Sequence, residues 1–557
     1  MPGALIVQSD ASILLDVHDP DAADAREDIA PFAELEKSPE HMHTYRITPL
    51  SLWNAAAAGL DAEHVHQRLA NHTRFPVPPN VRSQIEDTIS RFGRLRLITT
   101  EDDHTLRLEV DDLEVRVELA GRAKLQKLLR VDGEGFLLRL ADRGTLKQEL
   151  IQIGYPVEDL VPLSQGEAIV FGFRATTDSG IDFALRDYQT EAADTFYGGG
   201  ATGAGYGTVV LPCGAGKTVV GMAVMDHVQA STLILTTNIA AVHQWIDELV
   251  DKTTLDRSEI GEYTGQRKEI RAVTVATYQV LVWRPDKESD FPHFDLFRKR
   301  QWGLVIYDEV HLLPAPVFRV VAEIQAIRRL GLTATLVRED GHEADVFSLV
   351  GPKRYDVPWK QLEQKGWIAT ALCYEVRLDL PKSLRTEYAL ADRRAKFRIA
   401  SENSLKVEAC RQIVENHWQE SVMVIGQYLS QLEELARVLD APLVTGKLAN
   451  KRREEIYRAF REGTERVIVV SKVANFAIDL PDASVAVQVS GTFGSRQEEA
   501  QRLGRILRPK EHNNSHFYTL VSNQTVEETF AANRQRFLTE QGYAYRIDHW
   551  DGEFVTG

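Results

Sequence analysis

Residues 207–228 constrain the fold of this chain more than any other segment. A β-branched apolar run, Thr208–Leu211, leads through the sequence LPCGAGKT into a helix-like stretch that ends at Val228. When a buried strand, a glycine-rich turn and a helix follow one another in this way, the turn can wrap backbone N–H groups around a phosphate, and the helix N-terminus favours its negative charge. We therefore expect an α/β domain that binds a phosphorylated nucleotide.

The side chains of this turn have the chemistry that a nucleoside triphosphate needs. Lys217 supplies a cation to the β- and γ-phosphate oxygens during catalysis, and the Thr218 hydroxyl is placed to bind Mg²⁺. The strict pattern GxxxxGK[ST] fails at one position, because Leu211 stands where the first glycine belongs, and a plain flexible turn is the competing interpretation. The predicted nucleotide-binding residues of the turn are Pro212, Cys213, Gly214, Ala215, Gly216, Lys217 and Thr218.

A second strand-like run, Leu304–Tyr307, ends in the adjacent carboxylates Asp308 and Glu309. Open α/β sheets bind their ligands at the carboxyl ends of their strands. We predict that Asp308 holds Mg²⁺ through water and that Glu309 orients and polarises the water that attacks the γ-phosphate. An ordinary acidic turn is the alternative for such a pair, but its position directly after a strand favours the catalytic interpretation.

The net charge and the cysteines say less about the partner and the cellular compartment of this chain than the motifs say about its chemistry. The formal net charge of −16 argues against a basic nucleic-acid-binding surface, but much of the excess lies in residues 1–50, which hold ten acidic and three basic residues. Charge therefore neither supports nor excludes a nucleic-acid partner. The three cysteines form no CxxC pair, which fits a reducing cytoplasm better than a disulfide framework or a zinc site.

The N-terminal sequence MPGALIVQSD has no basic region ahead of its apolar run, so we expect no signal peptide. No apolar stretch is long enough to span a bilayer. We therefore expect a cytoplasmic protein without a membrane partner.

The organisation of the chain suggests several domains, since 557 residues exceed the size of a single core. Apolar runs alternate with amphipathic stretches from about residue 207 to 335 and again from about 422 to 490, which predicts two α/β domains with parallel sheets. The predicted segments are an N-terminal α+β accessory domain at 1–104, either winged-helix-like or partner-docking, a small α/β domain at 105–180, the first α/β domain at 181–350, a bridging segment at 351–406 and the second α/β domain at 407–557.

The string QRLGRILRP places three polar side chains on one face of a predicted helix. Gln501, Arg505 and Arg508 are spaced as i, i+4 and i+7. We assign them to catalysis, because such a face can bring guanidinium groups to the charge that develops on a γ-phosphate, an effect of about 10³ to 10⁵ in rate. A solvated basic helix is the alternative.

These motifs, in this order, resemble those of the XPB family of superfamily 2 DNA helicases, and in particular its bacterial members. The resemblance rests on the strings LPCGAGKT, YDEVHLLPAPVFR, LGLTATLVRED, VSKVANFAIDLP, GSRQEEAQRLGRILRPK and RQRFLTEQGYAYR. It implies two tandem RecA-like motor domains, the use of ATP and Mg²⁺, and 3′ to 5′ movement on single-stranded and forked duplex DNA, in DNA repair. It also implies a damage-recognition domain near 105–180 and a thumb-like insertion near 351–406.

The same resemblance assigns further residues. Arg186 and Gln189 match the element that reads adenine, and Asp479 matches a motif that links ribose and nucleic acid. Arg338, Glu339 and Asp340 match the RED motif, which the family uses in strand separation; a polar surface turn is the alternative. Candidate DNA-backbone contacts, for each of which a packing role is as good an explanation, are Thr237, Asn238, Thr277, Tyr278, Ser471 and Lys472.

Three other functions stay open on the sequence alone. A duplex DNA translocase would use the same ATPase without releasing a strand, and RNA is disfavoured only by the family resemblance. A scaffold that binds DNA or a partner with weak ATPase activity is a third, against which the intact motor residues argue. A nuclease or another repair protein is a further partner that the sequence leaves open.

Overall fold

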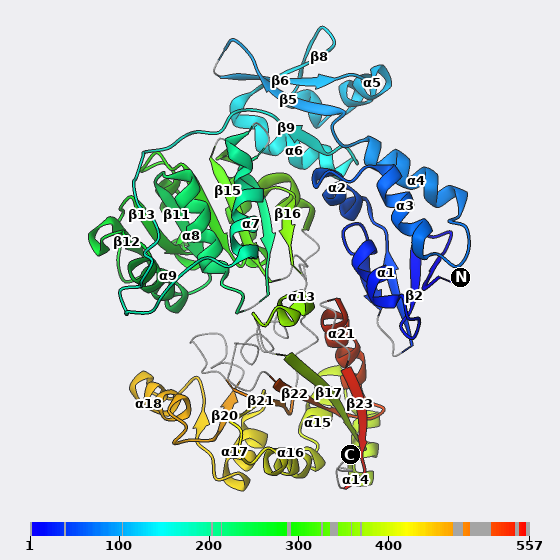
Figure 1. Cartoon of the computed structure of the whole chain (residues 1–557), viewed down its shortest axis with the longest axis vertical. Coiled ribbons are helices and arrows are strands. Elements are labelled where there is room, and N and C mark those ends of the chain that lie inside the picture. Colours follow the sequence, from blue (N-terminus) through cyan, green and yellow to red (C-terminus); the bar gives the residue numbers. More distant parts are fainter. Residues whose placement is uncertain are drawn as a thin grey trace. The chain divides into compact units, whose positions relative to one another are not determined.

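The computed structural model describes residues 3–37, 41–102, 104–201, 204–212, 214–286, 291–324, 327–334, 343–357, 359–367, 370–471, 483–490, 514–540 and 545–552. The chain forms two compact units, whose main division lies between Asp356 and Val357 (Figure 1). No helix among these residues is both long enough and apolar enough to cross a membrane.

A seven-stranded parallel sheet forms the centre of the first unit, in the order β12-β13-β11-β14-β15-β10-β16 (Figure 1). Its strands are β10 (Tyr206–Val210), β11 (Thr232–Thr236), β12 (Ile260–Tyr263), β13 (Val273–Thr277), β14 (Leu304–Asp308), β15 (Arg328–Thr333) and β16 (Lys353–Asp356). Both faces of such a sheet are covered, which explains why the runs in β10, β11 and β13 are buried at every position.

One helix precedes β10, and the others lie in the connections between strands of this sheet. The helices are α7 (Asp187–Tyr197), α8 (Lys217–Val228), α9 (Ile239–Lys252), α10 (Tyr278–Leu281), α11 (Ala315–Glu323) and the short α12 (Glu343–Asp345). A core that includes Leu233, Val305 and Val317 fills one side of the sheet. Because every strand runs the same way, all carboxyl ends meet at one edge, where the turn after β10 and the carboxylates after β14 both lie.

The N-terminal part holds a four-stranded sheet, β1-β2-β4-β3, and four helices. The elements are β1 (Leu5–Val7), β2 (Ser12–Asp16), α1 (Ala22–Ile29), β3 (Glu34–Lys37), β4 (Met42–Arg46), α2 (Pro49–Ala57), α3 (Ala62–His72) and α4 (Pro79–Ser90). Thr48 begins α2 with a capping box, because its hydroxyl accepts from the Ser51 amide and the Ser51 hydroxyl accepts from the Thr48 amide.

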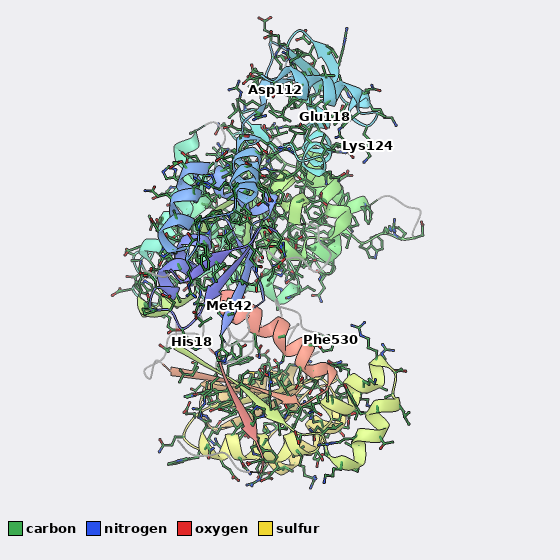
Figure 2. The ribbon with its side chains drawn as sticks, turned by 90° about the vertical axis from the view of Figure 1, so that its right-hand side faces the viewer. His18, Met42, Asp112, Glu118, Lys124 and Phe530 are labelled. Carbon is green, nitrogen blue, oxygen red and sulfur yellow. The ribbon has the colours of Figure 1, made fainter. Side chains whose placement is uncertain are left out.

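A five-stranded sheet follows, in the order β7-β8-β6-β5-β9. Its elements are β5 (Leu95–Thr99), β6 (Thr105–Val110), α5 (Leu113–Gly121), β7 (Arg130–Asp132), β8 (Gly135–Arg139), α6 (Arg143–Gln152) and β9 (Val157–Asp159). Asp112 caps α5, while Glu118 and Lys124 are exposed side chains of this small domain (Figure 2). The sheet begins at Leu95 and ends at Asp159, and only the pair β5 and β9 is parallel.

The second unit is built on another seven-stranded parallel sheet, β19-β20-β18-β21-β22-β17-β23. The strands are β17 (Thr370–Leu378), β18 (Val422–Gly426), β19 (Leu443–Val444), β20 (Val467–Ser471), β21 (Val485–Gln488), β22 (Asn514–Ser522) and β23 (Tyr545–Trp550). The helices are α13 (Trp359–Gln364), α14 (Lys382–Leu390), α15 (Arg393–Ser401), α16 (Leu405–Asn416), α17 (Leu429–Val438), α18 (Asn450–Arg461) and α21 (Val526–Glu540).

The two parallel sheets confirm the predicted fold class, two α/β domains in tandem with α+β accessory domains ahead of them. The predicted bridging segment 351–406 contributes to both sheets, since β16 pairs with β10 and β17 pairs with β22.

Candidate active site at the carboxyl edge of the first sheet

The turn after β10 has the backbone shape of a phosphate-binding loop. Gly214 and Gly216 have φ values of 80° and 76°, a left-handed region that glycine enters without strain. Helix α8 begins at Lys217, directly after Gly216. The helix dipole puts partial positive charge at this N-terminus, which favours an anionic ligand beside the turn.

Gly216 is fixed by its surroundings as well as by its conformation. A Cβ atom at this position would lie 2.7 Å from Nε2 of Gln189, which is closer than side chains approach one another. Gln189 is 4 % exposed, and its Oε1 accepts a hydrogen bond from the Arg186 amide at 3.0 Å. The segment LRDYQ therefore packs its glutamine directly against the turn, where the sequence predicts that Arg186 and Gln189 bind adenine.

The carboxylates of Asp308, the last residue of β14, and of Glu309, the next residue, lie beside this turn. Lys217 Nζ lies 3.4 Å from Glu309 Oε1, and both side chains are largely buried. Glu309 has a φ of 52°, a conformation that costs a residue with a side chain on the order of 1–3 kcal/mol and that occurs most often at functional sites. The strained backbone turns Glu309 toward the lysine of the phosphate-binding turn, although β15 lies between their two strands.

Burial and the charge of Glu309 raise the pKa of Asp308 to about 6. Burial also opposes ionisation of Glu309, but Lys217 and His311 outweigh it and hold the pKa of this carboxyl below its usual value. Glu309 is therefore ionised at neutral pH, as an acceptor for a water proton must be.

The donor set fits a magnesium ion. Two carboxylates face a single lysine, so ionisation of both leaves negative charge that a divalent cation can neutralise. Asp308 and the half-buried Thr218 supply oxygen ligands of the kind that Mg²⁺ prefers. Asp308 and Thr218 would hold the ion, and Lys217 with the α8 amides would bind the phosphates.

Two side chains to which the sequence analysis assigns no role, Trp245 and His311, complete this edge. Trp245 on α9 donates from Nε1 to Asp308 Oδ2 at 2.9 Å. His311 lies 3.4 Å from Glu309 and 2.6 Å from the Thr333 hydroxyl at the end of β15. His311 belongs to the YDEVH string, which could have revealed it, whereas nothing in the helical pattern around Trp245 indicates that its ring reaches a carboxylate.

The predicted DNA contacts of the first unit also lie at this edge. Asn238 accepts from the Ala241 amide as the cap of α9, and its amide donates to the Thr237 hydroxyl at 3.1 Å. Thr277 caps α10, and the Tyr278 hydroxyl donates to the Asp308 carbonyl at 3.0 Å. Thr277 and Tyr278 are each 3 % exposed, so both have packing roles in the structure.

The remaining predicted site residues divide into two groups. In the second unit Ser471 ends β20 and is buried. The others lie outside the residues that the structure describes: Cys213, Arg338, Glu339, Asp340, Lys472, Asp479, Gln501, Arg505 and Arg508.

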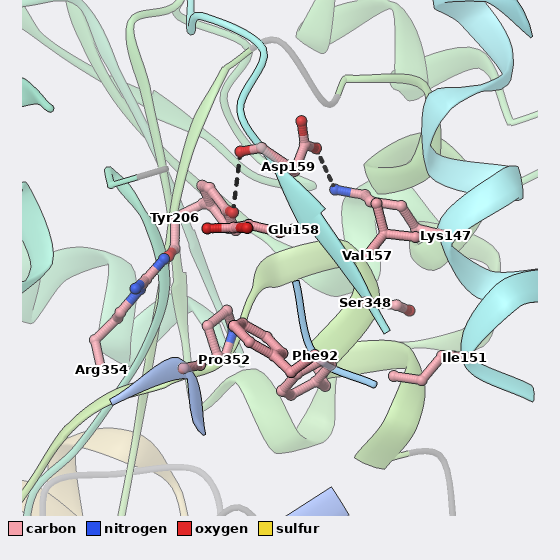
Figure 3. Close-up of a pocket in the computed structure, with 12 residues that line it drawn as sticks. Phe92, Lys147, Ile151, Val157, Glu158, Asp159, Tyr206, Ser348, Pro352 and Arg354 are labelled. Carbon is pink, nitrogen blue, oxygen red and sulfur yellow. Dashed lines mark hydrogen bonds and ion pairs between the residues drawn. The ribbon is translucent and has the colours of Figure 1, made fainter. Parts of the chain in front are cut away.

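A second group of buried charges lies at the amino end of β10. Asp159 accepts a hydrogen bond at 2.8 Å from Lys147, and its carbonyl accepts one from the Tyr206 hydroxyl at 3.2 Å (Figure 3). The Asp159 carboxylate also accepts two hydrogen bonds at 2.8 Å from Arg143. The group borders a cavity of about 230 Å³, which Phe92 and Arg354 also line. Tyr206 is the first residue of β10, and the turn that leads to Lys217 follows the last residue of this strand. The cavity therefore lies at the opposite edge of the sheet from Lys217.

Comparison with known proteins identifies relatives over the whole chain. The family described as "ERCC3/RAD25/XPB C-terminal helicase" matches residues 362–551, "Type III restriction enzyme, res subunit" matches 182–338, and "Helicase conserved C-terminal domain" matches 5–132. A Kineococcus radiotolerans protein named DNA 3'-5' helicase XPB is 53 % identical over 98 % of this chain and 96 % of its own length. A Mycobacterium tuberculosis protein of the same name is 52 % identical over 98 % of this chain and 97 % of its own.

A more distant relative is the Saccharomyces cerevisiae protein named "General transcription and DNA repair factor IIH helicase/translocase subunit XPB/SSL2". It is 30 % identical over 97 % of this chain and 71 % of its own length.

Proposed function

Because this chain belongs to the XPB family of helicases, we propose that it is an ATP-dependent 3′ to 5′ DNA helicase that acts in DNA repair. The observation that carries the proposal is the meeting of Lys217, Glu309 and the Gln189–Gly216 contact at one edge of the first sheet. The names of the two bacterial relatives supply the direction and the substrate class.

ATP is the substrate of the proposed reaction. The α8 amides and Lys217 bind its phosphates, and Arg186 with Gln189 contacts the adenine. Glu309 orients the attacking water and accepts its hydrogen bond, while His311 and Lys217 keep that carboxylate ionised. Magnesium, held by Asp308 and Thr218, supplies positive charge to the β- and γ-phosphate oxygens when it is bound.

The residues outside the described part keep the proposed roles that the sequence gives them. Arg505 and Arg508, with Gln501, stabilise charge on the γ-phosphate, and Asp479 couples the nucleotide to DNA. Arg338, Glu339 and Asp340 act at the point where the strands separate. Along the first sheet, Thr237 and Asn238 are the DNA-backbone candidates, because Thr277 and Tyr278 are almost fully buried.

The direct test is ATP hydrolysis by the full chain with no nucleic acid, single-stranded DNA, forked DNA and RNA, measured side by side. We expect DNA to stimulate hydrolysis and RNA to have little effect. Duplexes with a single-stranded tail at either the 3′ or the 5′ end then test the direction of movement. Unwinding that requires a 5′ tail, or hydrolysis that DNA does not change, would contradict the proposal.

A duplex DNA translocase is the second candidate, and the name of the yeast relative, helicase/translocase, favours it. The two activities differ in what they release. A translocase displaces a third strand from a triplex while the underlying duplex stays intact, whereas a helicase frees one strand of a fork. Strong stimulation by blunt duplex without strand release would select the translocase.

A further inference from the structure

Two histidines and a glutamate converge in the second unit, outside the nucleotide-binding motifs. His417 follows the last residue of α16, Glu420 stands in the turn before β18, and His516 is on β22. His516 is in register with Val485, which is in register with Val422, the first residue of β18. The group therefore lies at the amino edge of the second sheet, whereas Ser471 ends β20 at the carboxyl edge.

The distances within the group suit a shared ligand. One ligand atom from each of the three side chains lies within 4.8 Å of the others, and His417 Nδ1 is 3.1 Å from Glu420 Oε1. Two ligands bound to one zinc ion at about 2.0–2.2 Å each are separated by a little more than 3 Å in a tetrahedral site. Among the described residues this is the one group of three or more His, Cys, Asp or Glu side chains with such spacing.

Two further features of the histidines favour metal binding. His516 Nδ1 is buried and makes no hydrogen bond to any described residue, so this imidazole keeps an unused polar atom inside the protein. The other nitrogen of His417, Nε2, lies 2.9 Å from the Tyr518 hydroxyl, which is the outer contact that orients a metal-binding histidine.

The aromatic neighbours fix the second ring. Tyr374 stacks on Tyr518 with ring centroids 4.6 Å apart and on His516 with centroids 6.0 Å apart.

We propose that His417, Glu420 and His516 bind one divalent transition-metal ion of the zinc class. Two imidazoles and one carboxylate suit zinc and its neighbours, while Mg²⁺ and Ca²⁺ prefer oxygen ligands alone. All three side chains are half-buried, so water can occupy the remaining position. The ion would tie the end of α16 and the turn before β18 to β22. The site is independent of the proposed helicase activity, because none of its residues belongs to the motor motifs.

The test is zinc binding by the full chain without a histidine tag, after treatment with EDTA and dialysis. We expect isothermal titration with Zn²⁺ to show one ion bound through these residues, and Co²⁺ to give the visible absorption of a site with nitrogen ligands. Glu420→Gln and His516→Gln each remove a ligand, and each should lower the affinity by more than about 10-fold. Tyr518→Phe removes only the outer contact and should lower it by about 10- to 100-fold.

Matched histidine variants separate this site from incidental binding. His549 is exposed on β23 of the same unit, and His18 and His41 form an exposed pair with nitrogens 2.8 Å apart in the first unit. His549→Ala and the double variant of His18 and His41 should keep the zinc ion of the proposed site. Zinc should also raise the melting temperature of the wild type but not that of Glu420→Gln. The proposal is overturned if the wild type binds no zinc, or if Glu420→Gln and His516→Gln bind it as tightly as the wild type.

Discussion

The first unit contains two clusters of buried charge with similar residues and different construction. At the carboxyl edge of the sheet, Lys217 lies 3.4 Å from Glu309, a residue with a strained backbone, and the paired carboxylates exceed the lysine in charge. At the amino end of β10, Asp159 is held by Arg143 and Lys147 at 2.8 Å each, with side chains at most 5 % exposed. In the first cluster, the carboxylates of Asp308 and Glu309 leave negative charge that a bound ligand can neutralise. In the second cluster, Arg143 and Lys147 neutralise the carboxylate of Asp159.

This difference shows why burial and perturbed pKa values do not identify a catalytic centre by themselves. Both clusters have shifted pKa values, and a cavity of about 230 Å³ borders the second one. The distinguishing features of the proposed catalytic cluster are its long ion pair, its strained residue and its position at the start of α8. We expect substitutions in the first cluster to change activity and substitutions in the second to change stability.

The largest expected effect is that of Lys217→Ala on ATP hydrolysis. Removing the cation that faces the β- and γ-phosphates should lower the DNA-stimulated rate by at least about 10²- to 10³-fold. The melting temperature should stay near that of the wild type, because the ion pair of the lysine with Glu309 is long. Lys252→Ala, at the end of α9 in the same domain, is the matched control and should keep its activity. Turnover by Lys217→Ala at the wild-type rate would refute the nucleotide-site assignment.

The next effect is that of Asp159→Ala on stability. The substitution leaves Arg143 and Lys147 buried without their carboxylate, which costs about 3–5 kcal/mol in comparable cases. Thermal and urea unfolding of the full chain measure the loss. Lys124→Ala is the control, because its ion pair with Glu149 has a lysine that is 71 % exposed, and exposed pairs contribute less than about 1 kcal/mol. Equal losses in the two variants would show that the Asp159 cluster does not stabilise the fold.

Lys147 provides a smaller, pH-dependent test of the same cluster. Burial, with Arg329 and Arg143 nearby, lowers the pKa of Lys147 to about 7 despite the attraction of Asp159. Lys147 and Arg143, both on α6, hold the pKa of Asp159 far below its usual value although burial opposes them. The lowered pKa of Lys147 and the lowered pKa of Asp159 are consistent with each other if Asp159 stays paired with Arg143. Lys147 is then a second cation, which can lose its proton while that ion pair remains.

The sign of the pH effect follows from proton binding. Between pH 7 and the ordinary lysine value of 10.5, the unfolded chain binds more protons at Lys147 than the folded chain does. The free energy of unfolding of the wild type, measured relative to Lys147→Met, should therefore rise as the pH increases through this window. A difference that is flat or falls with pH would show that Lys147 stays charged in the folded protein.

The sequence predicts those parts of the first cluster that depend on residues close together along the chain. The β-branched runs before Pro212 and Asp308 are the strands β10 and β14, and the glycines of the turn adopt the positive φ values that only their type allows easily. Parallel strands then bring the two motifs to one edge without any knowledge of side-chain contacts.

Contacts between distant segments are what the sequence does not reveal. Trp245 reaches Asp308 only because of the rotation at which α9 packs on the sheet, and no local pattern encodes that rotation. The Asp159 cluster joins α6, β9 and the start of β10, three elements whose pairing depends on the tertiary fold. In the small sheet, β5 pairs with β9 in parallel across the whole small domain, so no turn signal connects them.

Trp245→Phe should have the smallest effect on hydrolysis. This substitution tests whether a neighbouring side chain changes the affinity of the first cluster for Mg²⁺. The substitution removes the N–H that donates to Asp308 Oδ2 but keeps an aromatic ring in a buried position. Loss of such an outer contact weakens metal binding by about 10-fold or somewhat more, so the Mg²⁺ concentration that gives half-maximal hydrolysis should rise by that factor. Trp283→Phe is the control, since Trp283 is 54 % exposed and belongs to neither cluster. If Trp245→Phe lowers the melting temperature but leaves the Mg²⁺ dependence unchanged, Trp245 has a packing role alone. The distinction between a cluster that binds a ligand and a cluster that stabilises the fold would then rest on Lys217 and Glu309.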